Sequence, residues 1–271
     1  MPRPRLGIST SSFFPRSLEE IFLILENQPW KDLELMPQSP AECRPEFAAT
    51  LDEAGKGRFG FCAIHFPLIL APFIYNPYPS AFEFGRQLCI DIAELGGRIG
   101  CSAIVVHGPW EKISKGVFLE ATLSNIRVLC DASAKHNIKV AFENTESSPF
   151  AVSPDAMLKF AEQIDRPNLS FTVDITHAFQ MDQDPLMYFS SLPHIAHVHA
   201  SDFDLITKKR HLPPGEGAVD WPSVVQGLKQ LNSLGSFVIE LLPETLGADP
   251  IKTIQKCTSL LDPLFMDWPS T

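Results

Sequence analysis

Six polar side chains that could bind a metal ion or move a proton each close a short apolar run of the sequence. In chain order they are His65, His107, Glu143, Asp174, His199 and Glu240. Glu143 and Glu240 follow the apolar runs AF and FVI, where an unpaired charge would be costly. A divalent cation would satisfy all six groups at once, whereas clustered carboxylates alone would repel one another and raise their pKa values. The sequence therefore indicates a metal site, and its mixed nitrogen and oxygen donors suit Zn, Mn, Co, Fe or Mg.

Each of these residues also has a plainer explanation when it is taken alone. A single histidine after a strand is more often a hydrogen-bonded polar residue than a ligand, and a glutamate there is often paired with arginine. Equivalent positions on six successive runs are harder to explain independently. The plainer explanation holds for His136, at a helix end, and for His194, which precedes an apolar run. His197 lies two residues before His199, so it shares a strand face with it and is expected to line the interior beneath the site.

The elements that must position these side chains repeat one alternation, in which short apolar runs are followed by amphipathic stretches. Eight runs are candidate strands: residues 5–9, 32–35, 59–65, 102–107, 138–143, 169–174, 195–200 and 236–241. They are nearly continuous apolar runs, which is typical of strands buried on both faces of a parallel sheet. The stretches between them carry helix signals, such as Ser153-Pro154 and Asp249-Pro250, which each place an N-cap before a first-turn proline.

Eight repeats of strand and helix predict an α/β fold of the (β/α)8 TIM barrel type, with one domain over residues 1–271. The carboxyl ends of all strands in such a barrel meet at one mouth, which would bring the six polar residues together. An open doubly wound sheet is the alternative. It would lack its usual phosphate loop, because neither GxGxxG nor GxxxxGK[ST] follows any run.

Composition excludes several classes of protein. Lys and Arg total 22 against 32 Asp and Glu, so the formal net charge is −10 and there is no chain-wide attraction for nucleic acid. The six cysteines form no CxxC pair and several lie in apolar runs, as reduced, packed thiols of a cytoplasmic protein do. The longest apolar run, Phe66 to Tyr75, is broken by Pro67 and Pro72 and cannot span a bilayer, so no membrane partner is expected.

Five short motifs, taken in order, resemble the xylose-isomerase-like TIM barrels. They are EN at 143–144, VDxxHA at 173–178, HVHxSD at 197–202, HLPPGEGxVDW at 211–221 and VIEL at 238–241. The resemblance runs from the first predicted strand to the last helix. This superfamily includes sugar and sugar-phosphate isomerases and epimerases, and also endonuclease IV, the apurinic-site nuclease.

The isomerase branch of this resemblance implies one divalent metal. Its ligands would be Glu143, Asp174, His199 and Glu240. The metal would polarise adjacent sugar oxygens, and carboxylates would move a carbon-bound proton through an enediolate. Glu143 and Glu240 would be the catalytic acid and base, and His177 would contact the substrate.

The endonuclease branch implies three zinc ions. Eight of its nine ligands have counterparts here, which adds His65, His107, His177 and His211 to the four residues of the isomerase set. The ninth ligand is an aspartate whose position holds Lys209, and a protonated lysine cannot replace a carboxylate. A third hypothesis, from a different class, is a sugar-binding barrel without catalytic activity.

Loops beside the predicted mouth offer substrate contacts. Trp110 could stack on a sugar face, and the basic residues Lys209 and Arg210, next to His211, could hold a substrate phosphate. Phe66, Phe73, Tyr75 and Tyr78, in the loop after the third run, could wall a pocket or pack onto neighbouring loops. Glu34, at the end of the second run, could line the pocket, but a salt bridge is the favoured expectation.

The leading hypothesis from the sequence is a cytoplasmic, divalent-metal-dependent isomerase or epimerase of small sugars or sugar phosphates. Nucleic acid would be a partner only under the endonuclease hypothesis, and the sequence allows a homo-oligomer.

Overall fold

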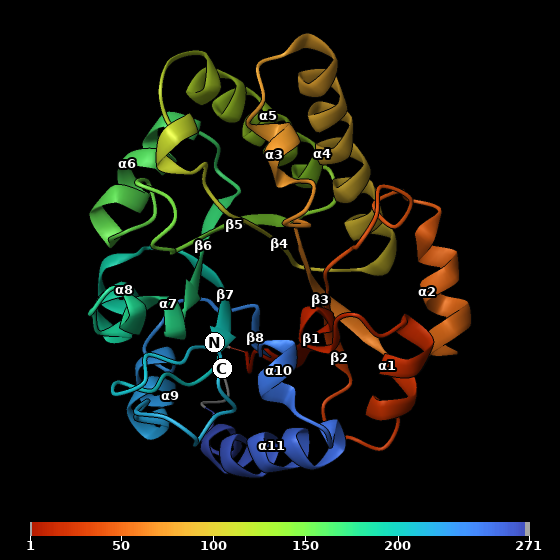
Figure 1. The fold of residues 1–271 in the computed structure, drawn as a ribbon, viewed down its shortest axis with the longest axis vertical. Coiled ribbons are helices and arrows are strands. Elements are labelled where there is room, and N and C mark those ends of the chain that lie inside the picture. Colours follow the sequence, from red (N-terminus) through yellow and green to blue (C-terminus); the bar gives the residue numbers. More distant parts are fainter. Residues whose placement is uncertain (1, 269–271) are drawn as a thin grey trace.

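Eight parallel strands close into one barrel in the computed structural model, which describes residues 2–268 (Figure 1). The strands are β1 (Arg5–Ser9), β2 (Asp32–Leu35), β3 (Gly60–His65), β4 (Ala103–Val106), β5 (Lys139–Glu143), β6 (Leu169–Asp174), β7 (Ile195–Ala200) and β8 (Ser236–Ile239). Each strand pairs with the next one in the chain, and β8 pairs with β1. The predicted TIM barrel is confirmed, and the open doubly wound sheet was the wrong alternative.

Helices follow the strands and surround the barrel (Figure 1). They are α1 (Leu18–Leu25), α2 (Phe47–Gly55), α3 (Ala71–Ile74), α4 (Pro79–Ile99), α5 (Gly116–Ala134), α6 (Pro154–Ile164), α7 (Ile175–Gln180), α8 (Pro185–Ser191), α9 (Trp221–Leu228), α10 (Pro243–Leu246) and α11 (Pro250–Met266), with short 3-10 helices η1 (Thr10–Phe13) and η2 (Glu111–Ile113). The Ser153 side chain accepts a hydrogen bond from the Ala156 N–H, and Asp249 accepts one from the Lys252 N–H. These caps satisfy donors that the first helical turn leaves without partners, so α6 and α11 begin where the sequence predicts.

Two of the six strand-end residues lie one position beyond their strands. β4 ends at Val106 and β8 at Ile239, whereas the apolar runs predict strands that continue through His107 and past Glu240. The Glu240 N–H still donates to the Ala200 carbonyl at 3.3 Å, so the chain leaves the sheet at this residue. Both residues therefore stand at the carboxyl-terminal rim of the barrel.

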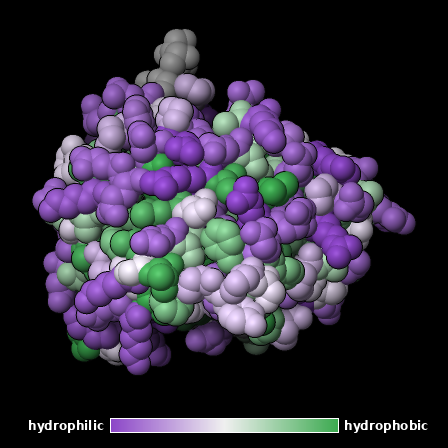
Figure 2. Space-filling model, turned by 90° about the horizontal axis from the view of Figure 1, so that it is seen from above, coloured by the Kyte–Doolittle hydropathy of each residue, from purple (hydrophilic) through white to green (hydrophobic). Residues whose placement is uncertain are grey.

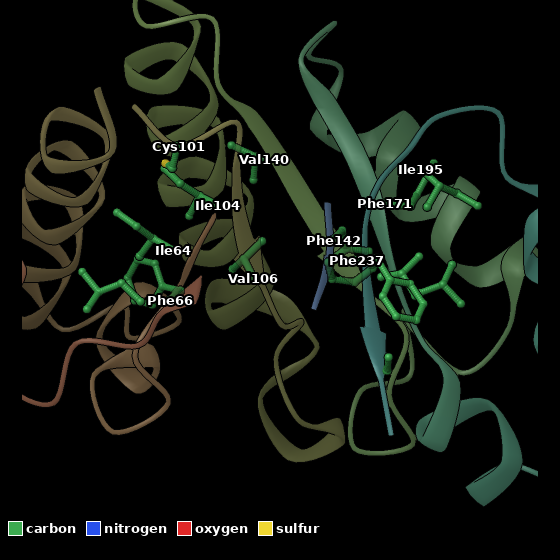
Figure 3. Packing of buried hydrophobic residues seen from close by; sticks show 14 of the residues in the cluster. Ile64, Phe66, Cys101, Ile104, Val106, Val140, Phe142, Phe171, Ile195 and Phe237 are labelled. Carbon is green, nitrogen blue, oxygen red and sulfur yellow. The ribbon is translucent and has the colours of Figure 1, made fainter. Parts of the chain in front are cut away.

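The buried residues form two layers. Large side chains such as Ile64, Ile104 and Phe142 belong to the main apolar cluster between barrel and helices (Figure 3). A second buried cluster consists of the small residues Cys62, Ala63, Ala103, Ala141 and Val238. Successive side chains of a strand point to opposite faces, so each alanine lies on the opposite face to the large residue that follows it. Ala63 pairs in register with Glu34, and such small neighbours leave room for polar side chains inside the barrel.

The outer surface is predominantly hydrophilic on the face that Figure 2 shows, with hydrophobic residues dispersed among polar ones. Within residues 2–268, no helix has both the length and the apolar character that crossing a membrane requires. All six cysteines are buried and free, as expected for packed thiols.

The loop between β7 and α9 is held by one buried carboxylate, Asp202. It accepts hydrogen bonds from the N–H groups of Phe203, Gly215 and Val219 and from the Trp221 indole. Gly215 has φ +93°, and a Cβ at position 217 would lie 2.4 Å from an Asp202 oxygen, so both positions of the GEG motif require glycine. This part of the HLPPGEGxVDW motif is therefore structural, and it returns His211 to the mouth of the barrel.

Candidate active site

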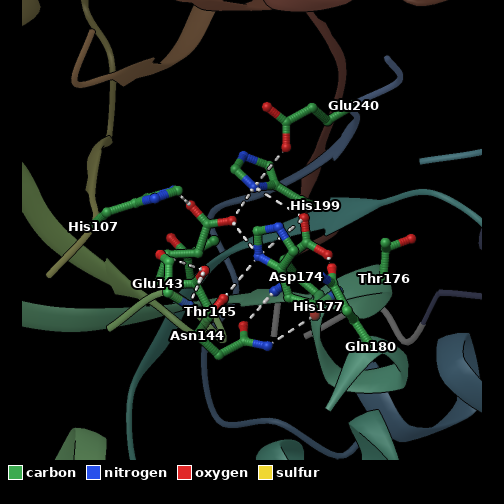
Figure 4. Close-up of polar contacts among 12 residues, drawn as sticks. His107, Glu143, Asn144, Thr145, Asp174, Thr176, His177, Gln180, His199 and Glu240 are labelled. Atoms are coloured by element: carbon green, nitrogen blue, oxygen red, sulfur yellow. Dashed lines mark hydrogen bonds and ion pairs between the residues drawn. The ribbon is translucent and has the colours of Figure 1, made fainter. Parts of the chain in front are cut away.

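Four of the strand-end residues form one compact group at the mouth (Figure 4). Ligand atoms of Glu143, Asp174, His199 and Glu240 all lie within 4.8 Å of one another. The His199 Nδ1 atom is 2.9 Å from Glu143 Oε1, 3.2 Å from Glu240 Oε2 and 3.8 Å from Asp174 Oδ2. A single ion bound at roughly 2.0–2.3 Å could reach a ligand atom of each residue. We call these four residues the four-ligand group.

Charge balance within this group depends on His199. Burial would lower the pKa of His199, but the charges of the carboxylates around it, Glu240 first among them, hold that pKa well above 6.5. Burial would raise the pKa of Glu143, but the charges of His199 and His107 and their hydrogen bonds hold it well below 4.5. A proton on His199 thus balances ionised carboxylates, and a divalent cation could replace it.

Asp174 supplies the observation that tests whether a cation fits. Its Oδ1 atom accepts a hydrogen bond from the His177 N–H at 2.8 Å. Its Oδ2 atom is buried and has no hydrogen-bond partner among the described residues. Asn144 fixes the backbone of Asp174 through two bonds, from Asn144 Nδ2 to the Asp174 carbonyl and from the Asp174 N–H to Asn144 Oδ1. A rigidly held, buried oxygen without a donor fits a metal ligand.

His65 and His107 extend the site on the side of β3 and β4. The His107 Nε2 atom lies 2.9 Å and the His65 Nε2 atom 3.4 Å from Glu143 Oε2. The His65 Nδ1–H can donate to the Phe66 carbonyl, 2.9 Å away. Burial would lower the pKa of His65, but its hydrogen bond with Glu143 and nearby carboxylate charges raise it to about 9. With Glu143, these histidines form a second set of neighbouring ligand atoms.

His177 and His211 form a third set with Asp174. The His177 Nδ1 atom is 2.9 Å from the Asn144 carbonyl, and the His211 Nδ1 atom is 3.2 Å from Ser201 Oγ. The two rings are perpendicular, with centroids 5.2 Å apart. Burial lowers the pKa of His211, whereas Asp174 and other carboxylates outweigh burial and raise that of His177.

A cavity of about 420 Å³ opens over these residues, a size typical of small-molecule sites. Its polar lining includes His107, Glu143, His177 and Glu240. Its apolar lining includes Leu68, Tyr75 and Trp110. The Tyr75 hydroxyl donates to the His107 carbonyl at 2.9 Å, which ties an apolar lining residue to the loop that carries His107.

Four of the five residues predicted to contact the substrate line the cavity. His177, His211, Trp110 and Arg210 line the cavity, and Arg210 lies 3.5 Å from both Glu146 and Gln180. Lys209 is exposed and is not among the lining residues. The reason is the preceding turn, in which Lys208 donates to the Asp204 carbonyl and has φ +58°.

The aromatic loop after β3 contributes less to the cavity than the sequence predicted. Tyr75 lines it, but Phe66 is buried in the core, and neither Phe73 nor Tyr78 is a lining residue.

Three residues in the site carried little signal in the sequence. Ser11, in η1, lies with its Oγ 3.3 Å from Glu240 Oε1, but a serine after a strand is common. Asn144 was visible only as part of the EN motif. The Glu34 carboxylate lies 3.0 Å from ring nitrogens of His197 and His199 and does not line the cavity.

The chain is a (β/α)8 barrel with histidine and carboxylate side chains clustered at the carboxyl-terminal rim. The family model described as the xylose isomerase-like TIM barrel matches residues 19–257, and the chain belongs to this family.

Two proteins are similar to this chain in sequence, and a solved structure is similar to it in fold. An uncharacterised protein of Methanocaldococcus jannaschii is 28% identical over 251 residues, which cover 87% of this chain and 83% of that protein. The 2-oxo-tetronate isomerase of Pectobacterium atrosepticum is 25% identical over 174 residues, 61% of this chain and 64% of that enzyme. The crystal structure of a D-tagatose 3-epimerase-like protein has a TM-score of 0.75 and 21% identity, with 96% of both chains covered.

Proposed function

We propose that this chain is a divalent-metal-dependent isomerase or epimerase of small sugars or sugar phosphates. The observation that carries the proposal is the four-ligand group, in which two carboxylates that face one cavity also lie within reach of a single ion. The family and the epimerase-like neighbour support this class of reaction.

The four-ligand group would hold the ion. When bound, a divalent cation would polarise the carbonyl and hydroxyl oxygens of a ketose and so acidify the proton on the carbon beside the carbonyl. Water is restricted at this point, because Glu143, Asp174 and His199 are each no more than 1% exposed. Such a site strengthens every charge interaction within it.

Glu240 and Glu143 would move the proton. Glu240 is 13% exposed at its side chain and is near one imidazole, that of His199, so it is the better placed of the two to take a proton from a substrate in the cavity. Glu143 is surrounded by His199, His107 and His65, and its low pKa makes it a weaker base. We assign proton abstraction to Glu240, which would take the proton from the substrate carbon and leave an enediolate. Glu143, the other member of the pair, would return a proton to that carbon after receiving one from His107 or His65, which contact its Oε2 atom.

Residues above the ion would bind the rest of the substrate. The His177 Nδ1–H points to the Asn144 carbonyl, which leaves Nε2 for a sugar hydroxyl. Arg210 and His211 lie at the cavity wall, where an anionic group could bind, and Trp110 offers a half-exposed ring for a sugar face. The apolar wall would pack against the carbon chain.

The test is exchange of a carbon-bound proton with solvent. Incubating the chain with Mn²⁺ and a panel of ketoses in heavy water is expected to introduce deuterium beside the carbonyl, detected by proton NMR. Removing the metal with a chelator should stop the exchange, and adding it back should restore the exchange. A metal-loaded chain that exchanges no proton of any ketose in the panel would argue against the proposal.

A metal-dependent endonuclease is the second candidate, and the three neighbouring sets of ligand atoms favour it. The four-ligand group shares Glu143 with the second set and Asp174 with the third set, so the three sets could hold ions close together. Against it, Lys209 stands where the nuclease has a carboxylate, and the formal charge of −10 opposes long-range approach of DNA.

We therefore expect fewer than three firmly held metal ions and weak or no cleavage of duplex DNA at abasic sites. Metal analysis after dialysis gives the number of ions, and a gel assay with Zn²⁺ or Mn²⁺ measures cleavage. The Lys209→Asp variant is the matched comparison. Efficient cleavage by the unmodified chain, at a rate that this substitution leaves unchanged, would place the nuclease first.

A further inference from the structure

A buried carboxylate on β2, Glu34, contacts the four-ligand group from beneath. It is 0% exposed and is not among the residues that line the cavity. Its Oε2 atom lies 3.0 Å from His199 Nε2 and 3.0 Å from His197 Nε2. The pairing of β2 with β3 shifts register between Leu33 and Glu34, and such irregularities redirect a side chain.

Hydrogen-bond chemistry assigns the proton on each ring. An ionised carboxylate only accepts, so both histidines present N–H at Nε2 to Glu34. His197 then accepts at Nδ1 from the Ser236 hydroxyl, 2.7 Å away, as a neutral ring can. Its Nε2 atom contacts Glu34 at 3.0 Å but does not have the geometry of a hydrogen bond. When a cation replaces the proton on its Nδ1, His199 has the same tautomer, and this Nδ1 faces carboxylate oxygens of Glu143 and Glu240, which cannot donate to it.

We propose that Glu34 is a positioning residue that holds His199 as the Nε2–H tautomer and thereby presents the Nδ1 lone pair to the metal ion. This inference rests on the metal site of the proposed function. The 3.0 Å contact of Glu34 with His197 Nε2 and the hydrogen bond from Ser236 to His197 Nδ1 hold the carboxylate itself in place. A carboxylate behind a ligating histidine fixes the ring orientation and increases the basicity of the ligand nitrogen.

Glu34, His197 and His199 could instead hold an ion by themselves, since their ligand atoms also lie close together. The contacts favour the positioning role. Both imidazoles lie at direct hydrogen-bond distance from one carboxylate oxygen, and all three side chains are fully buried. An ion among them would need both Nε2 atoms deprotonated, whereas the Ser236 hydroxyl beside His197 Nδ1 suits the Nε2–H form.

The experiment is a titration of the full chain and its Glu34→Gln variant with Co²⁺ alone, followed by visible absorption and equilibrium dialysis. The amide keeps the size of the side chain but removes its charge and one of its two acceptor positions. We expect the Kd for Co²⁺ to rise about 10- to 100-fold. Ser236→Ala is the matched control, because it removes the buried hydrogen bond to His197 but leaves the Glu34–His199 bond intact. The Kd of this variant for Co²⁺ should change less than about threefold.

A measurement on the unmodified chain avoids any dependence on how the variant folds. In the Zn²⁺-loaded chain with ¹⁵N-labelled histidine, NMR should show His199 protonated at Nε2 and metal-bound at Nδ1. The opposite tautomer would contradict the role of Glu34. Equal Kd values for the unmodified chain and Glu34→Gln would also contradict it, and so would an equal loss of Co²⁺ affinity in Glu34→Gln and Ser236→Ala. An unmodified chain that binds no Co²⁺ would instead overturn the four-ligand site and the proposed function with it.

Discussion

In the Glu240→Gln variant, exchange of the proton beside a ketose carbonyl with heavy water is expected to fall by about 10²- to 10⁴-fold. An amide oxygen can still approach a metal ion, but it cannot accept a proton at neutral pH. Glu240 is the carboxylate of the four-ligand group that faces the cavity with part of its side chain exposed. Loss of the proton acceptor should therefore reduce the chemical step more than it reduces binding.

Glu240 is both the proposed base and a member of the four-ligand group, so loss of the base must be separated from loss of the ion. Metal content is measured on the same samples, and exchange is compared at saturating Mn²⁺. Glu216→Gln, an exposed carboxylate paired with Lys256 and outside the cavity, is the control for the same chemical change. Normal exchange by a metal-loaded Glu240→Gln variant would remove Glu240 from the role of base.

The barrel and the position of the site could be predicted from the sequence because both follow from local pattern. Apolar runs of four to seven residues predict buried parallel strands, and the closed barrel brings their carboxyl ends to one rim. Glu143, Asp174 and His199 end or nearly end their strands, so local pattern alone placed them side by side.

The finer arrangement depends on contacts between distant segments. Glu34 precedes His199 by 165 residues. The register shift between β2 and β3 at Glu34 cannot be recognised from the amino-acid composition of either strand. Lys209 shows the same limit. Its place beside His211 in the sequence predicts a position at the mouth, but the turn closed by Lys208 and Asp204 leaves it exposed outside the cavity. Loop geometry of this kind is set by hydrogen bonds that periodicity does not reveal.

The stabilisation that a divalent ion gives to the fold is expected to increase as the pH rises from about 6 to about 9. The pKa of His199 is held well above 6.5 and that of His65 is raised to about 9. Without an ion, protonation of these rings stabilises the fold fully below pH 6.5, and this contribution is lost as the pH rises through the raised values.

The contribution of the carboxylates to the stability of the fold changes with pH in the opposite direction. Glu143 and Glu34 have pKa values held below 4.5, so their contribution is present above that pH and is lost as the pH falls below it. Without an ion, the combined contribution of these two histidines and two glutamates to stability should therefore be largest between about pH 4.5 and 6.5. An ion competes with the proton for His199 Nδ1, so its affinity should rise about tenfold per pH unit for each proton that it displaces.

Thermal unfolding with excess Zn²⁺ and with a chelator, at about pH 5.5, 7 and 8.5, measures this difference directly. The gain in Tm from the ion should be smallest at the lowest pH and largest at the highest. His194→Asn, which changes an exposed histidine away from the cavity, should keep the same pH dependence. His199→Asn should lose most of the gain at every pH, because its Nδ1 is the one nitrogen in the four-ligand group. An ion that raises Tm equally at all three pH values would show that it does not displace the proton of His199, and that the carboxylates bind it elsewhere.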